Sequence, residues 1–147
     1  MKNDELKELI NIYSDPYIKQ ISHDHREANI IVHPNVTYLA AKINNKIVGA
    51  FLAIKTNPTE IELHSLLTKK AIKHSRELGS LCIDWAFSFT EVQRVTANII
   101  QGLEKAKNYC LKLGFVHEGT KRDALLKNGK LKDVYILGIT RKQRRTT

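Results

Sequence analysis

The chain has 147 residues, of which 42% are hydrophobic and 27% are charged, with seven glycines and three prolines. This length and composition are typical of one globular domain with its own core, and they exclude collagen, low-complexity and wholly disordered chains. No apolar run of about 18 residues occurs, so we expect no membrane-spanning helix. The start does not resemble a signal peptide and two cysteines make no disulfide framework, which together predict a reducing, cytoplasmic location.

The net charge of the chain is +9, and most of the excess lies near the C-terminus. Residues 121–147 hold nine basic residues and two acidic ones. Such a segment is typical of contact with phosphate, in nucleic acid or in a phosphorylated cofactor, and equally of a solvated surface. We therefore expect a basic tail at residues 141–147, with nucleic acid or another acidic molecule as its candidate partner.

The N-terminal region predicts two helices. Over residues 3–13, apolar side chains recur at the spacing of one helix face. Pro16 ends this helix, because the residue before a proline is disfavoured in the helical conformation. A second, shorter helix is expected over residues 17–26.

Three strands are predicted next. Residues 36–43 and 46–54 are rich in β-branched and apolar residues, and Asn44-Asn45 lies between them. Asparagine tolerates positive φ, which a tight two-residue hairpin turn requires. Residues 59–67 alternate in polarity, as a half-buried strand does. The polar side chains that this alternation places on one face are Glu60, Glu62 and His64.

The second half of the chain alternates helices and strands. Apolar spacing and β-branched runs predict a helix over residues 74–89, a strand over 92–100, a helix over 103–113 that stops at Gly114, and a strand that begins at Phe115. A last pair of strands, 122–126 and 132–139, flanks the turn Asn128-Gly129. This order excludes a helix bundle and a pure β-sandwich, and it predicts an α/β mixed sheet with helices on both faces.

Three stretches carry a resemblance to a known family. They are the hairpin with Val48-Gly49, the helix that ends in Asp84-Trp85-Ala86-Phe87, and AKNYCLKLGFVHEG from Ala106 to Gly119, followed by Arg122, Asn128-Gly129-Lys130 and Asp133-Val134-Tyr135. Together they resemble the GNAT superfamily of acetyl-CoA-dependent N-acetyltransferases, and the last stretch is similar to the C-terminal signature of its RimJ/RimL-like members. The resemblance spans residues 36–140. It implies a single GNAT-like domain over residues 1–140, with a twisted, mostly antiparallel sheet of about six or seven strands.

The resemblance also implies a site for the pyrophosphate of acetyl-CoA. In this family a loop of pattern Q/R-x-x-G-x-G/A opens onto a helix N-terminus, where backbone N–H groups and the helix dipole meet the anion. In this chain Lys73 stands where the first glycine belongs, so its ammonium can reach a phosphate while its Cβ can also close the cradle. The cofactor-binding residues that this comparison assigns are Lys70, Ala71, Ile72, Lys73, His74 and Ser75.

The implied reaction is direct attack of a primary amine on the thioester, for which a base must first take a proton from the ammonium. Glu62 and His64 are the candidate bases, and an imidazole titrates in the right pH range. The resemblance further implies a backbone N–H at a bulge around Leu66 and Leu67 as the oxyanion donor. Many family members have a tyrosine on the last helix that protonates the leaving thiolate. At that position this chain has Cys110, which the resemblance therefore makes the candidate acid. His64 and Cys110 also fit purely structural roles.

Other functions remain open at this level. A catalytically degenerate GNAT-fold module is the main alternative, since the chain also resembles phage-encoded GNAT-like proteins of the virion or of head assembly. An active enzyme needs an open pyrophosphate cradle at residues 70–75 and a V-shaped gap between strands 59–67 and 92–100, whereas a structural module can have that gap filled by side chains. The acceptor amine is not readable from the sequence. An exposed final strand would permit a homo-oligomer, and the spacing of His23, His25 and His33 matches no metal site.

Overall fold

The computed structural model describes residues 7–8, 11–12 and 33–146 of the chain. Residues 7–8 and 11–12 are helical, in agreement with the helix predicted over residues 3–13. The second predicted helix, over residues 17–26, lies outside the described residues, and so do His23 and His25. Within the described part, no helix is long and apolar enough to cross a membrane.

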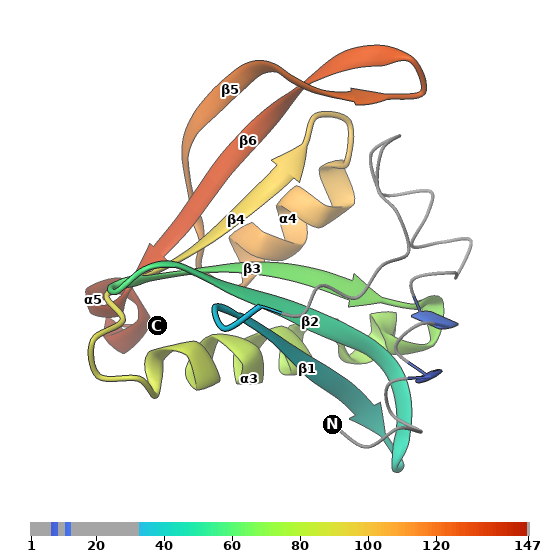
Figure 1. Cartoon of the computed structure of the whole chain (residues 1–147), viewed down its shortest axis with the longest axis vertical. Coiled ribbons are helices and arrows are strands. Elements are labelled where there is room, and N and C mark those ends of the chain that lie inside the picture. Colours follow the sequence, from blue (N-terminus) through green and yellow to red (C-terminus); the bar gives the residue numbers. More distant parts are fainter. Residues whose placement is uncertain (1–6, 9–10, 13–32, 147) are drawn as a thin grey trace.

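Six strands form one open, twisted sheet in the order β1-β2-β3-β4-β6-β5 (Figure 1). Every neighbouring pair is antiparallel except β3 and β4, which are parallel. The predicted mostly antiparallel sheet of about six or seven strands is therefore confirmed, with six strands. The strands are β1 (Val36–Ile43), β2 (Lys46–Asn57), β3 (Glu60–Leu67), β4 (Arg94–Ile100), β5 (Val116–Lys127) and β6 (Lys130–Thr140).

The predicted turns are present because their residues adopt positive φ. Asn44 and Asn45, between β1 and β2, have φ of 51° and 65°. Asn128 and Gly129, between β5 and β6, have φ of 53° and 72°. Two consecutive residues in this region make the turn whose twist matches that of the flanking strands. Gly114, at φ 103°, follows the end of a helix, as the sequence predicted.

The helices after β3 are η1 (Lys69–His74, a 3-10 helix), α3 (Ser75–Phe87), α4 (Glu104–Lys112) and α5 (Arg141–Thr146). Helices α3 and α4 cover one face of the sheet, and among the described residues Ile12 lies on the other. Side chains of α3 and α4 pack in one core with alternate residues of the strands, such as Leu63 on β3 and Leu137 on β6. On the opposite face, Ile12 from the N-terminal helical residues packs against Leu66 of β3.

The end of the sheet differs from the sequence prediction. The strand predicted to begin at Phe115 and the strand predicted over 122–126 are parts of one strand, β5. Its pairing with β6 shifts register between His117 and Gly119 and between Lys121 and Leu125. The final strand, β6, is not exposed at an edge, because it pairs with β4 on one side and β5 on the other. The exposed edge beside it belongs to β5, so the expectation of an exposed final strand was wrong for Val134–Thr140, the part of β6 that pairs with β4.

The basic segment predicted as a tail forms α5 and docks on α3. The Arg141 guanidinium donates to the carbonyl oxygens of Phe87 at 2.9 Å, Phe89 at 2.8 Å and Val92 at 2.9 Å. The Arg144 guanidinium pairs with Asp84 of α3 at 2.8 Å. Carbonyls at a helix C-terminus lack hydrogen-bond donors within the helix. Arg141 supplies donors to the carbonyls at and just after the end of α3, which would otherwise bond to water. Two basic residues of this segment thus serve the fold, and a nucleic-acid partner stays a prediction.

We expect Arg141→Ala to lower the free energy of unfolding by about 2–3 kcal/mol, because it removes three charge-assisted hydrogen bonds at the end of α3. Chemical denaturation followed by circular dichroism measures this change. Lys142→Ala is the matched control, since Lys142 is exposed on the same helix. Equal stability of the two variants would show that the docking of α5 does not stabilise the fold.

Candidate active site

The sheet opens where β3 and β4 stop pairing. These parallel strands are bonded only at Glu60–Arg94, Ile61–Val95 and Glu62–Thr96. Figure 1 shows that they start side by side and diverge toward their arrowheads. The V-shaped gap that an active enzyme needs is therefore present.

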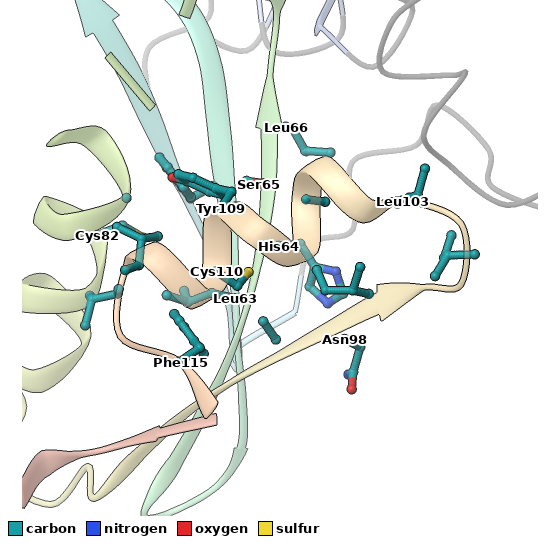
Figure 2. A pocket seen from close by; sticks show the side chains of 18 of the residues that line it. Leu63, His64, Ser65, Leu66, Cys82, Asn98, Leu103, Tyr109, Cys110 and Phe115 are labelled. Carbon is teal, nitrogen blue, oxygen red and sulfur yellow. The ribbon is translucent and has the colours of Figure 1, made fainter. Parts of the chain in front are cut away.

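A cavity of about 240 Å³ occupies this gap and extends between α3 and α4 (Figure 2). Most of its lining is apolar, and His64 and Asn98 supply polar side chains from the two diverging strands. Side chains therefore leave this gap open, whereas in a structural module they can fill it. The other lining residues are Phe51, Leu63, Ser65, Leu66, Gly79, Cys82, Ile83, Ala97, Ile99, Ile100, Leu103, Ala106, Tyr109, Cys110, Leu113, Phe115, Leu125 and Val134.

The backbone of β3 presents hydrogen-bonding groups to this gap. The Thr68 N–H donates to the Val48 carbonyl of β2, and bonded pairs alternate along an antiparallel ladder. By that alternation Leu66 bonds to β2, while the backbone groups of Ser65 and Leu67 point away from β2. Pairing with β4 has ended before this point, so these groups face the gap.

The oxyanion donor predicted around Leu66 and Leu67 therefore changes in one respect. β3 pairs in unbroken register with β2 from Ile61 through Leu67, so the expected bulge at Leu66–Leu67 is not formed. Regular alternation orients the Leu67 N–H, and not that of Leu66, into the gap. Gly49 permits this close pairing, because a Cβ there would lie 2.7 Å from the Leu66 carbonyl oxygen.

The two candidate bases form a bonded pair on the opposite face of β3 from α3. His64 Nε2 lies 3.1 Å from Glu62 Oε1, and the side-chain amide of Asn98 donates to the same oxygen. The hydrogen bond from His64 lowers the pKa of Glu62 most strongly. Desolvation opposes this shift, while the charge of His64, the Asn98 bond and the charge of Lys121 lower the pKa further. Glu62 is consequently an ionised, fixed carboxylate at neutral pH.

Glu60, the third polar residue on this face, belongs to a separate network. The Thr96 hydroxyl donates to Glu60 Oε2, and the Arg94 guanidinium lies 3.3 Å from the same carboxylate. Arg94 also pairs with Glu118 of β5, on the far side of β6. Gly138 of β6 leaves room for this pair, because a Cβ there would collide with both side chains. Glu60 is thus held by structural partners and is not directed at the cavity.

Cys110 lies at the cavity wall together with Cys82, and both are buried free thiols. Burial raises the pKa of each thiol to about 12. A donor with so high a pKa transfers its proton to an ordinary thiolate only uphill, because a free thiol has a pKa near 8.5. The neighbouring Tyr109 hydroxyl is engaged at 2.6 Å with the Ser75 carbonyl, and burial raises its pKa as well. The geometry therefore makes Cys110 a poor acid.

Neither thiol should react readily in the folded protein, because both are buried and neutral well above pH 8. We expect labelling by N-ethylmaleimide at pH 8 to be slow in buffer and to reach two thiols per chain in denaturant. Mass spectrometry of the labelled chain measures the rate and the site. Rapid labelling of Cys110 in the native protein would instead identify it as an activated thiol.

The predicted phosphate-binding stretch is a helix and not an open loop. Residues Lys69–His74 form η1, which runs directly into α3 at Ser75. The Ala71 N–H donates to Thr68 and the Ser75 N–H to Ile72, so these two amides are used within the backbone. The stretch lacks the glycines that open such a loop, and its residues adopt helical dihedrals. Ala71 is fully buried, whereas Lys70, Ile72, Lys73 and His74 are exposed.

Comparison with known proteins identifies the family. Residues 6–115, three quarters of the chain, match the model of the acetyltransferase (GNAT) family. The chain belongs to the GNAT family of acetyltransferases. Acetyl-CoA is accordingly its acetyl donor, as the resemblance implied. No curated protein sequence matches the chain.

Solved structures confirm the GNAT fold. A spermidine N-acetyltransferase from Vibrio cholerae in complex with CoA and spermine is similar, with a TM-score of 0.84 at 15% identity, covering 99% of this chain and 95% of that one. A putative acetyltransferase has a TM-score of 0.80 at 18% identity, with 99% and 83% covered. A GNAT-family acetyltransferase from Streptococcus pneumoniae has a TM-score of 0.63 at 25% identity, with 72% and 67% covered. The RimJ/RimL-like and phage resemblances stay predictions.

Asn98 is the site residue that the sequence reasoning missed. It lies two residues after Thr96 on β4, so both side chains project from one face of a strand that otherwise reads as a β-branched run. This polar alternation was the available signal. The contact with Glu62 depends on the register between β3 and β4, which no local pattern specifies. Among the described residues, no group of three or more metal-ligating side chains comes together.

Proposed function

We propose that this acetyltransferase transfers the acetyl group to a primary amine by direct attack of the amine on the thioester. The cavity at the gap between β3 and β4, with the Glu62–His64 pair beside it, carries the proposal. When bound, acetyl-CoA supplies an activated acyl group. The cavity fits its pantetheine arm, because apolar walls suit the arm's carbons and the backbone groups of Ser65 and Leu67 suit its amides.

His64 is the base and Glu62 orients it. The lowered pKa of Glu62 makes its carboxylate a weak proton acceptor, whereas an imidazole changes charge near neutral pH. With Nε2–H donating to Glu62, the other ring nitrogen, Nδ1, carries the lone pair that takes a proton from the amine. The carboxylate then stabilises the positive charge that develops on the ring.

Backbone and basic groups of the chain complete the site. The Leu67 N–H, which faces the gap, is the donor for the charge that develops on the carbonyl oxygen, and one such donor contributes about 3–4 kcal/mol. Lys70 and Lys73 bind the phosphates through side-chain charge, with His74 beside them, because η1 offers no open backbone cradle. Binding through exposed ammonium groups weakens as salt rises.

Polyamines are the first acceptors to test. The Vibrio cholerae structure named above contains spermine, although 15% identity shows the fold alone. The sheet face that carries His64 also carries the ionised carboxylate of Glu62, which suits a cationic acceptor. Peptides with a free N-terminus or a lysine are the second class. The open gap between β3 and β4 favours an active enzyme over a catalytically inactive module, whereas the helical η1 at the place of the pyrophosphate cradle is a feature that such a module would also show.

The test is steady-state acetyl transfer with spermidine, spermine and amine-bearing peptides as acceptors. We expect His64→Gln to lower kcat/KM at least 100-fold, since general base catalysis contributes about 10²–10⁴-fold. Glu62→Gln should have a smaller effect, and wild-type kcat/KM should fall at acid pH as the imidazole gains a proton and can no longer accept one.

His33→Gln is the matched control, because His33 is exposed before β1 and far along the chain from the site. It should retain wild-type activity. Unchanged kcat/KM in His64→Gln would remove His64 from the mechanism.

A further inference from the structure

We propose that Asn98 is a positioning residue, whose side-chain amide fixes the Glu62 carboxylate and thereby holds His64 with Nδ1 available to the acceptor amine. This inference rests on the proposed function and adds to it a residue of the other strand. It makes the base a three-residue unit that spans the gap.

The position of Asn98 makes it a link between the two strands. The β3–β4 backbone pairing ends at Glu62–Thr96, and Asn98 is the next residue on that face of β4. Its own backbone is paired with Ile136 of β6. The side-chain hydrogen bond from Asn98 to Glu62 therefore joins β3 and β4 just beyond the last pair of residues that their backbones bring together. Asn98 and His64 both line the cavity and are labelled in Figure 2.

Two donors converge on a single oxygen of Glu62. Oε1 accepts from the Asn98 amide and faces His64 Nε2. Glu62 is about four-fifths buried, with 20% of its side chain exposed, so water does not substitute freely for a lost donor. Removing the amide leaves the carboxylate held by His64 alone, and the pair can then rotate as a unit.

The surroundings of Glu62 offer little replacement for Asn98. On β2, the residues paired with Glu62 and His64 are the apolar Ile54 and Leu52. From β5, Lys121 acts on Glu62 through its charge. Three further charged groups on this face, Glu60, Arg94 and Glu118, are paired with one another.

The expected consequence is a change in the base and not in cofactor binding. The Asn98 amide donates a hydrogen bond to Glu62 Oε1, the oxygen that also contacts His64. This bond weakens the attraction of the carboxylate for a protonated imidazole. In Asn98→Asp a second carboxylate replaces the donor and stabilises that protonated form. The acid limb of the kcat/KM profile then moves to higher pH.

Kinetics with the full chain test the inference. We expect Asn98→Ala to lower kcat about 10- to 100-fold, with the KM for acetyl-CoA within twofold of wild type. Asn98→Asp should move the acid limb to higher pH. Thr96→Val is the matched control, because Thr96 lies on the same face of β4 and donates to Glu60 instead. It should change neither quantity. A pH profile of Asn98→Asp that superimposes on wild type would overturn the proposal.

Nuclear magnetic resonance separates failure of this inference from failure of the proposed function. The ¹⁵N shifts of the His64 ring, assigned with His64→Gln, report which nitrogen carries the proton. We expect the Nε2–H form in the wild type and a mixture of both tautomers in Asn98→Ala, even if no acceptor is acetylated. The same tautomer in both proteins would overturn the positioning role.

Discussion

The early end of the pairing between β3 and β4 is the constraint on which the site depends. Three residue pairs join the strands, and beyond them each backbone loses its neighbour on that side. Buried backbone groups without partners are costly, so a ligand with amides of its own is a natural occupant of the gap. The same divergence leaves room for the cavity and places the side chains of β3 and β4 where Asn98 can reach Glu62.

Helix α3, which forms one wall of the cavity, is fixed at both ends. At its start the Tyr109 hydroxyl of α4 donates to the Ser75 carbonyl, and at its end Arg141 of α5 donates to the carbonyls of Phe87 and Phe89. Gly79 lets the two helices approach, since a Cβ there would collide with the Tyr109 ring. A wall held in this way keeps the cavity open without a ligand, and a preformed site loses less entropy on binding.

Local chemistry explains what could be predicted from the sequence. The two hairpin turns follow from Asn44-Asn45 and Asn128-Gly129, which accept positive φ, and the face shared by Glu62 and His64 follows from strand alternation. Long-range contacts explain what could not. Residues 141–146 form a helix whose arginines bind carbonyls about 50 residues earlier, and no pattern in that segment indicates those partners.

Two other departures have different causes. The phosphate-binding stretch Lys70–Ser75 resembles a glycine-containing pattern only in position, and its own residues, which include no glycine, form the helix η1 instead. The interior place of β6 depends on the order of strands in the sheet, which the chain order does not reveal. Asn98 combines both difficulties, because its significance appears only once two distant strands are placed in register.

Calorimetric titration with CoA tests most directly whether the cavity between β3 and β4 is the cofactor site. The account predicts saturable binding of one CoA per chain. It also predicts at least tenfold weaker binding in Ala106→Phe, in which a bulky side chain from α4 fills part of the cavity. Absence of binding at millimolar CoA, or equal affinity in a folded Ala106→Phe variant, would contradict it.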